Sequence, residues 1–182
     1  MAYIKVPDGV PGIRSLVMFR PETGKYLYEL VQTLLRGPSP LKESEREMIA
    51  AYVSNKNNCG FCMNSHAAAA RCLLGDEESL MDDILNEPDA AAINNKMKAL
   101  LNIAAKVQVS GKEVDQEDIN NAREAGADDM DIHDTVLIAA TFSMFNRYVD
   151  GLNSLTPENK DDYREMGIRM AEKGYLLPQQ QK

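Results

Sequence analysis

The sequence predicts an all-α protein, a helical bundle in which a Cys-x-x-Cys motif lies at the N-terminus of one helix. The first reason is composition: there is no Trp and there are only four Phe, whereas Ala, Leu, Met and Ile are plentiful, which favours packed helices over a β-sandwich. The second is periodicity, because apolar residues recur at helical spacing and no segment alternates as a strand does. The third is length: 182 residues, 44% of them hydrophobic, suit one core, so we expect a single domain over 1–182.

The N-terminal part is expected to be an extended lead-in followed by two helices. Residues 1–20 contain two Pro and two Gly close together, which disfavours regular structure there. A helix over 22–36 follows and stops at Gly37. Its apolar face consists of Leu27, Leu30, Val31 and Leu34. The next helix is expected over 43–55, and it is broken by Asn57, Asn58 and Gly60.

The remaining elements are expected to be helices joined by short breaks. One starts near the cysteines, contains four consecutive Ala and ends at Gly75. An acidic stretch, 76–89, is expected to hold one short helix. An apolar stripe indicates a helix over 93–107, and a capping Asp indicates one over 116–125. An almost wholly apolar run indicates a helix over 131–149, and a Thr-Pro pair is expected to open the last helix, over 157–173. The tail, 175–182, is expected to be mobile at its end.

Charge and hydropathy exclude several classes of partner. The net charge is −8 and no basic patch is evident, which argues against nucleic acid or an anionic membrane surface. The first residues show no basic stretch followed by an apolar one, so we do not expect a signal peptide. The longest apolar-rich run, Val136–Phe145, is too short to cross a bilayer. We therefore expect a cytoplasmic protein, in which Cys-x-x-Cys is more often redox-active or metal-binding than a permanent disulfide.

One stretch, EMIAAYVSNKNNCGFCMNSH, gathers the residues that are the best candidates for a catalytic site. Cys59 and Cys62 form the Cys-x-x-Cys pair, His66 follows four residues after the second cysteine, and Glu47 lies twelve residues before the first. The chain has three Cys and two His in all, so three of those five residues gather here. Two thiols, an imidazole and a carboxylate are the groups that thiol redox chemistry with a proton relay requires.

Two features predict a lowered pKa, and hence a thiolate, at Cys62. The pair lies at a helix start, where unpaired backbone N–H groups favour negative charge. His66 lies one turn beyond Cys62 on the same helical face and can take the thiol proton. Attack on a peroxide would then give a sulfenic acid, which condenses with Cys59 to form a disulfide. An external dithiol must reduce that disulfide.

Glu47 admits two interpretations. Its helical face continues through small residues to Ser54, so another helix could approach closely and the carboxylate could orient His66. Alternatively, Ser44-x-x-Glu47 fits a capping box, in which Glu47 only holds the N-terminus of its helix. Spacing alone favours neither interpretation.

The cysteines also have two plainer interpretations, a structural zinc site or two inert core thiols. Zinc takes four ligands, whereas Cys59, Cys62 and His66 offer three. Cys72 is about three turns farther along the same helix and is expected to be a small core residue. His133 precedes the most apolar helix and is expected to be a cap or a surface residue, outside the site.

The combined pattern resembles a known family. The spacing Glu-x11-Cys-x2-Cys-x3-His, with EREMIAAYVS around the Glu and an Ala-rich helix after the His, resembles the AhpD-like alkylhydroperoxidases of the carboxymuconolactone decarboxylase superfamily. The later segment AREAGADDMDIHDTVLIAATFSMFNRYVDGL is similar to the peroxidase-related branch of that group. The resemblance covers about residues 16–177, and its motif is specific in combination rather than through Cys-x-x-Cys alone.

The resemblance implies an all-helical fold, homo-oligomers and hydroperoxide reduction without a bound cofactor. Electrons would come from a dithiol partner such as a lipoylated protein. By motif position, Cys62 resembles the peroxidatic cysteine and Cys59 the resolving cysteine, while His66 and Glu47 resemble the proton relay. The best-described members have a histidine just before the second cysteine, where this chain has Phe61, so one relay member is absent.

Two other functions remain open at this point. One is a general thiol–disulfide oxidoreductase whose substrate is a protein disulfide. The other is a non-catalytic helical oligomer in which the motif is a structural, zinc-type site.

Overall fold

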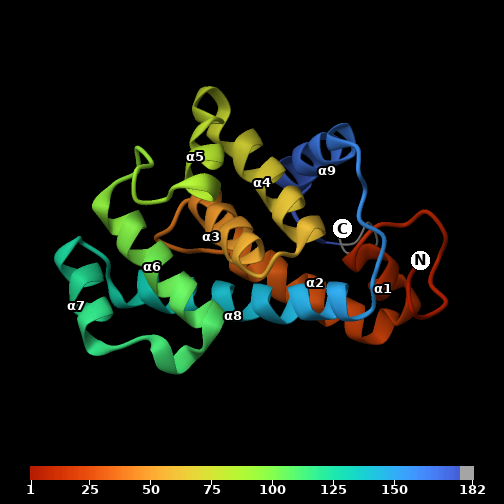
Figure 1. The fold of residues 1–182 in the computed structure, drawn as a ribbon, viewed down its shortest axis with the longest axis horizontal. Coiled ribbons are helices and arrows are strands. Elements are labelled where there is room, and N and C mark those ends of the chain that lie inside the picture. Colours follow the sequence, from red (N-terminus) through yellow and green to blue (C-terminus); the bar gives the residue numbers. More distant parts are fainter. Residues whose placement is uncertain (177–182) are drawn as a thin grey trace.

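Every regular element in the computed structural model, which describes residues 1–176, is a helix (Figure 1). The predicted all-α class is therefore confirmed. The α-helices, in chain order, are α1 (Ile13–Phe19), α2 (Pro21–Arg36), α3 (Glu43–Lys56), α4 (Gly60–Leu74), α5 (Leu80–Asn86), α6 (Asn95–Val109), α7 (Gln116–Glu124), α8 (Asp129–Gly151) and α9 (Lys160–Lys173). Two short 3₁₀ turns are η1 (Gly75–Glu77) and η2 (Gly111–Glu113).

Residues 1–20 are not wholly an extended lead-in, because they include helix α1. Leu16 in α1 is fully buried, so tertiary packing stabilises a helix too short to be evident from periodicity. Gly12 starts it with a φ of 53°, and the Ser15 hydroxyl donates to the Gly12 carbonyl over 2.8 Å. A Cβ at Gly12 would lie 2.1 Å from the Phe61 ring, so this glycine allows α1 to approach the start of α4.

The last helix begins later than predicted. The Thr156-Pro157 pair precedes α9 instead of opening it, and Asn159 is the N-cap, accepting from the Asp161 N–H over 3.0 Å. The Pro157 carbonyl accepts from the Tyr163 hydroxyl over 2.9 Å. This local contact holds the segment before α9 against the first turn of the helix.

Helices α3 and α4 form the centre of the fold. Their buried small residues are Ala50, Ala51, Ala67, Ala69 and Ala70. Helix α4 packs on α3 on one side and on α9 on the other, while the long helix α8 runs beneath them (Figure 1). The approach of α9 is close, because a Cβ at Gly167 would lie 2.7 Å from the Cβ of Ala68.

The apolar interior has two clusters. The larger one lies among α3, α4, α6 and α8 and includes Ile49, Leu100 and Phe142. The smaller one surrounds the cysteines and consists of Leu16, Cys59, Phe61, Cys62, Val149 and Tyr163. The motif therefore lies inside the protein, where α1, α8 and α9 meet the start of α4.

Two expectations about isolated residues have opposite outcomes. Cys72 is exposed, so its assignment to the core was wrong. His133 is on the surface as expected, with 63% of its side chain exposed and its Nδ1 3.0 Å from Asp134. Within residues 1–176, no helix has the length and apolar character needed to cross a membrane.

Candidate functional site

The turn between α3 and α4 positions the Cys-x-x-Cys motif. Asn58 adopts a positive φ of 57°, which reverses the chain after α3. Cys59 is the N-cap of α4, its N–H donates to the Ser54 carbonyl over 3.0 Å, and its carbonyl accepts from Met63 over 2.9 Å. Cys62 is the third residue of α4. The motif is therefore at a helix N-terminus, as predicted.

Both motif cysteines are free, buried thiols that interact with each other. Cys59 is 0% exposed and Cys62 is 3% exposed, and a side-chain hydrogen bond links the two. This contact brings the second sulfur within reach of the first. It also holds the pKa of Cys62 well above its usual value, together with burial. The thiolate predicted at Cys62 is therefore wrong for this structure, because burial and the neighbouring thiol outweigh the helix N-terminus.

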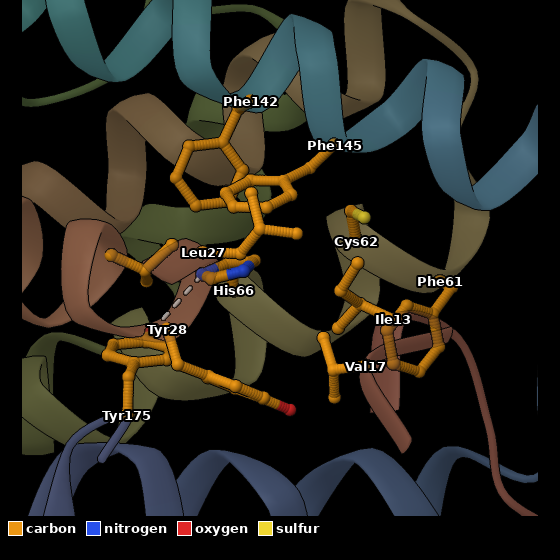
Figure 2. A pocket seen from close by; sticks show the side chains of 11 residues that line it. Ile13, Val17, Leu27, Tyr28, Phe61, Cys62, His66, Phe142, Phe145 and Tyr175 are labelled. Carbon is orange, nitrogen blue, oxygen red and sulfur yellow. Dashed lines mark hydrogen bonds between the residues drawn. The ribbon is translucent and has the colours of Figure 1, made fainter. Parts of the chain in front are cut away.

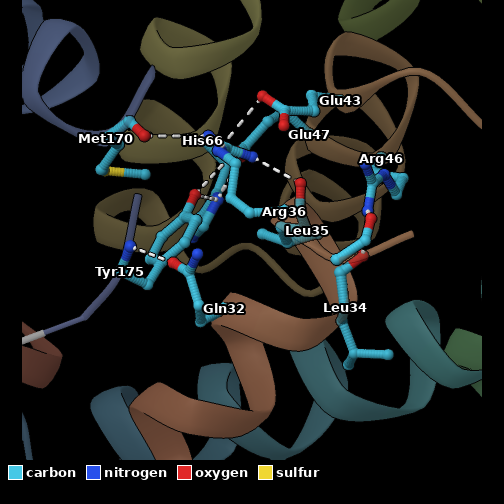
Figure 3. A network of polar contacts seen from close by, with 11 residues as sticks. Gln32, Leu34, Leu35, Arg36, Glu43, Arg46, Glu47, His66, Met170 and Tyr175 are labelled. Carbon is cyan, nitrogen blue, oxygen red and sulfur yellow. Dashed lines mark hydrogen bonds and ion pairs between the residues drawn. The ribbon is translucent and has the colours of Figure 1, made fainter. Parts of the chain in front are cut away.

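Glu47 and His66 lie together in the interior. Glu47 Oε2 is 2.7 Å from His66 Nδ1, and the two residues are 0% and 8% exposed (Figure 3). The capping box at the start of α3 uses Glu45 instead, whose Oε2 accepts from the Lys42 N–H over 2.8 Å. The capping interpretation of Glu47 is therefore excluded, and its contact with His66 is the one the relay interpretation requires.

Glu47 is held as a carboxylate. Burial alone would raise its pKa, but the charge and hydrogen bond of His66, the charge of Arg36 and the hydroxyl of Tyr175 together hold the pKa below its usual value. Arg36 Nη2 donates to Glu47 Oε1 over 2.6 Å. Because a carboxylate accepts at His66 Nδ1, that nitrogen carries the proton and Nε2 is left as the basic nitrogen.

Tyr175 and Arg36 also belong to this network, although no sequence pattern pointed to either. The Tyr175 hydroxyl donates to Glu47 Oε1 and lies 3.3 Å from His66 Nδ1. The rings of Tyr175 and His66 stack with centroids 5.9 Å apart, and the Arg36 guanidinium lies 5.1 Å from the centre of the Tyr175 ring.

The position of Tyr175 corrects one prediction. The segment 175–182 was expected to be a tail, but Tyr175 is buried and its N–H donates to Gln32 Oε1 over 2.7 Å (Figure 3). Tyr175 follows the end of α9 and lies 109 residues from His66 in sequence, so no local pattern could relate the two. Residues 177–182 lie outside the described part of the chain.

An apolar cavity of about 50 Å³ opens onto Cys62 and His66. Figure 2 shows the His66 ring near its centre, with Tyr175 to one side and Cys62 to the other. The other lining residues are Ile13, Val17, Leu27, Tyr28, Val31, Phe61, Phe142 and Phe145. No hydrogen bond among the described residues joins Cys62 to His66. The two functional groups thus line the same small cavity without a hydrogen bond between them.

Phe61 forms part of that wall. Its ring lies 6.3 Å from the ring of Tyr163 and touches the backbone of Gly12. Position 61, at which the best-described members of the family that the sequence resembles have a histidine, is therefore an apolar packing position here.

The described residues contain no ligand set for a metal. In the chain up to Leu176, no three His, Cys, Asp or Glu side chains converge in a way that could hold an ion. Among the described residues, Cys59 and Cys62 therefore lack the further ligands that a structural zinc site would need.

Comparison with known proteins finds a matching family model. The model of the carboxymuconolactone decarboxylase family matches residues 21–106, which include α3 and the Cys-x-x-Cys motif. No curated protein matches the chain.

Solved structures show the same fold. The chain is 29% identical to an uncharacterized peroxidase-related protein from Silicibacter sp. TM1040, with a TM-score of 0.76, covering 85% of this chain and 79% of that one. It is 26% identical to a second such protein, an alkylhydroperoxidase AhpD core from Ralstonia eutropha JMP134, with a TM-score of 0.77, covering 87% and 82%. A protein of unknown function from Agrobacterium tumefaciens, 18% identical with a TM-score of 0.67 over 79% and 97%, shares the fold. Over residues 21–106 the chain is thus similar to the carboxymuconolactone decarboxylase family, and it shares its fold with solved proteins described as peroxidase-related.

Proposed function

We propose that this protein is a thiol-dependent peroxidase that reduces hydroperoxides through Cys59 and Cys62 and needs no bound cofactor. One observation carries the proposal: Cys62 and His66 face one cavity, with a second thiol behind Cys62 and an ionised carboxylate behind His66. The proposal includes a cytoplasmic location, because the cycle needs a reducing compartment. It also includes homo-oligomers, which the family resemblance implies.

The first step oxidises Cys62. A hydroperoxide enters the cavity, His66 Nε2 takes the Cys62 proton, and the sulfur attacks the terminal peroxide oxygen. An S–O bond forms and the O–O bond breaks, which gives a sulfenic acid and an alkoxide. His66 returns the proton to the alkoxide, and an alcohol leaves. Because the resting thiol is protonated, the base is required in this step, and Glu47 favours the imidazolium that forms.

The second step forms a disulfide and the third reduces it. The Cys59 sulfur attacks the Cys62 sulfenic acid, the S–O bond breaks, and water leaves with the Cys59 proton. A dithiol partner of the lipoyl type then reduces the disulfide by exchange and becomes a disulfide itself.

The cavity favours this reaction over that of a general thiol–disulfide oxidoreductase. Cys59 is 0% exposed, and the cavity that Cys62 lines has a volume of only about 50 Å³. A small hydroperoxide fits such a space, whereas a folded protein disulfide must come within bonding distance of a sulfur.

Mass spectrometry of the thiols tests the proposal. In a Cys72→Ser background, which removes the exposed thiol, one equivalent of an organic hydroperoxide should convert Cys59 and Cys62 to a disulfide. With Cys59→Ser added, Cys62 should stop at a sulfenic acid that dimedone traps. Cys62→Ser should abolish both products and serves as the matched control. Oxidation of Cys62 no faster than that of a free thiol would overturn the proposal and favour the disulfide oxidoreductase.

A further inference from the structure

The Cys62 sulfur has a second polar neighbour, Asn146 of α8. Asn146 is 1% exposed and its amide interacts with Cys62 as a hydrogen-bond donor. Cys62 is otherwise enclosed by apolar side chains and by Cys59. Burying a polar amide in such surroundings is unfavourable unless its hydrogen bonds are made, so we expect each polar atom of this amide to have a partner.

The orientation of the Asn146 amide is set by a directed chain of hydrogen bonds. Gln108 Nε2 of α6 donates to Asn57 Oδ1 over 2.8 Å, and Asn57 Nδ2 donates to Asn146 Oδ1 over 2.8 Å. Asn146 Nδ2 then donates to the Ser54 hydroxyl over 3.0 Å. The amide oxygen is thus occupied by Asn57, which turns the NH₂ group toward Ser54 and Cys62. An amide nitrogen has two hydrogens, and Ser54 takes one.

We propose that Asn146 is a further catalytic residue: the N–H that Ser54 does not use donates to the Cys62 thiolate as it forms, and Asn57 is a positioning residue that keeps this N–H on the sulfur. The proposal rests on the proposed function, because it assigns a role in the same oxidation step. The same N–H can donate to the sulfenic acid as well.

The other groups around the sulfur make such a donor necessary. The hydrogen bond of Cys59, burial and the charge of Asp150 each raise the pKa of Cys62, whereas the Asn146 hydrogen bond lowers it. Tyr163 of α9 is the remaining titratable neighbour, with its own pKa raised mainly by burial. His66 can remove the proton but makes no hydrogen bond to the sulfur. Among these contacts, the Asn146 amide is the one that favours the charge left behind.

The test measures Cys62 ionisation without any peroxide. Alkylation of Cys62 by iodoacetamide is followed against pH in a Cys72→Ser background, with the site resolved by peptide mass spectrometry. Asn146→Leu removes the donor at similar volume and should move the midpoint to higher pH by about one unit, a tenfold loss of thiolate at a given pH below it. Asn146→Asp keeps the shape but offers a carboxylate to the sulfur, and should move the midpoint farther in the same direction.

A matched control is Asn64→Leu. Asn64 lies on α4 near the cysteines, but its amide donates to the Gly60 carbonyl over 2.9 Å and hydrogen-bonds to Tyr163, and Asn64 is not among the groups that shift the Cys62 pKa. This variant should keep the parent midpoint. Asn57→Ala, which frees the Asn146 oxygen without touching the sulfur, should give a smaller shift than Asn146→Leu. Circular dichroism and thermal unfolding identify the variants that fold, and any one folded Asn146 variant decides the question.

The outcomes separate this proposal from the proposed function. Folded Asn146→Leu or Asn146→Asp protein with the parent midpoint would overturn the role of Asn146, whatever the peroxide assay shows. A shifted midpoint in a parent protein that does not react with hydroperoxide would overturn the peroxidase function instead, and Asn146 would remain the residue that stabilises the thiolate.

Discussion

Glu47 is the residue on which the buried polar network converges. One oxygen faces His66 and the other accepts from Arg36 and Tyr175, with every partner largely buried. A buried carboxylate without such partners would be neutral, and a neutral Glu47 would not hold the proton on His66 Nδ1. The same contacts thus keep Glu47 charged, and this one charge both orients His66 and contributes to the stability of the fold.

Replacing Glu47 is expected to reduce both stability and oxidation rate. Glu47→Gln removes the charge facing Arg36 in a buried site, which should lower the free energy of unfolding at neutral pH by about 3 kcal/mol. The folded pKa of Glu47 is lowered, so this contribution is complete above the unfolded pKa, about 4.3, and is lost as pH falls through the lower folded pKa.

Urea unfolding of both proteins between about pH 7 and about pH 3 measures this effect. The difference between them should shrink toward the acidic end. A difference that stays constant over the whole range would contradict an ionised Glu47 in the folded protein.

Tyr175 is expected to contribute through its hydroxyl. Tyr175→Phe keeps the ring stacked on His66 but removes the hydrogen bond to Glu47. A lost orienting hydrogen bond of about 1.4 kcal/mol would slow Cys62 oxidation about tenfold. Stopped-flow oxidation by an organic hydroperoxide gives the rate. Tyr52→Phe, on the same helix as Glu47 and equally buried, is the control and should react at the parent rate.

Helix α9 contributes to the site by positioning Tyr175, which follows its C-terminus. It packs on α4 at Gly167, and the chain then turns at Gly174, with a φ of 64°, to place Tyr175 against Glu47. The close contact of α9 with α4 therefore determines where Tyr175 lies, although α9 itself carries none of the motif residues.

A side chain at Gly167 is expected to disturb both packing and chemistry. In Gly167→Ala the new Cβ would lie 2.6 Å from the backbone carbon of Ala68, so α9 must shift, at about 1–3 kcal/mol of stability. Thermal unfolding and the oxidation rate should both fall. Gly151→Ala, also in a helix but with open space around its Cβ, should keep the parent values. Equal effects of the two changes would show that helix propensity, not the α4–α9 contact, is responsible.

Segments near both ends of the described part of the chain pack against the site. Leu16 of helix α1 is buried beside the cysteines, and Tyr175, which follows α9, contacts Glu47. This arrangement makes the site sensitive to residues far from the motif.

Truncation tests that dependence directly. A chain that ends at Gly174 lacks Tyr175 and is expected to fold less stably and to oxidise Cys62 more slowly than the full chain. A chain that ends at Leu176 keeps the contacts of Tyr175 with Glu47, His66 and Gln32 and should match the full chain. Unfolding and stopped-flow measurements on the two truncated proteins provide the comparison. Equal loss in both would place the contribution in the final residues instead of in Tyr175.

Local patterns predicted much of this protein. The helices after residue 20 follow their apolar spacing and Gly breaks because a helix is defined by contacts three and four residues apart. Cys59, Cys62 and His66 are close together because they share one helix start. Glu47 was found by its motif position, although two interpretations of it were equally compatible with spacing.

Contacts between distant segments decided the rest. Packing against the cysteines makes residues 13–19 a helix, and Tyr175, Arg36 and Asn146 reach the site from parts of the chain with no local signature of function. The charge state of Cys62 was also decided there, because desolvation and neighbouring groups act through space and depend on what the fold places around the sulfur. The sequence by itself determined which groups are available for chemistry, and the tertiary structure determined their protonation and their partners.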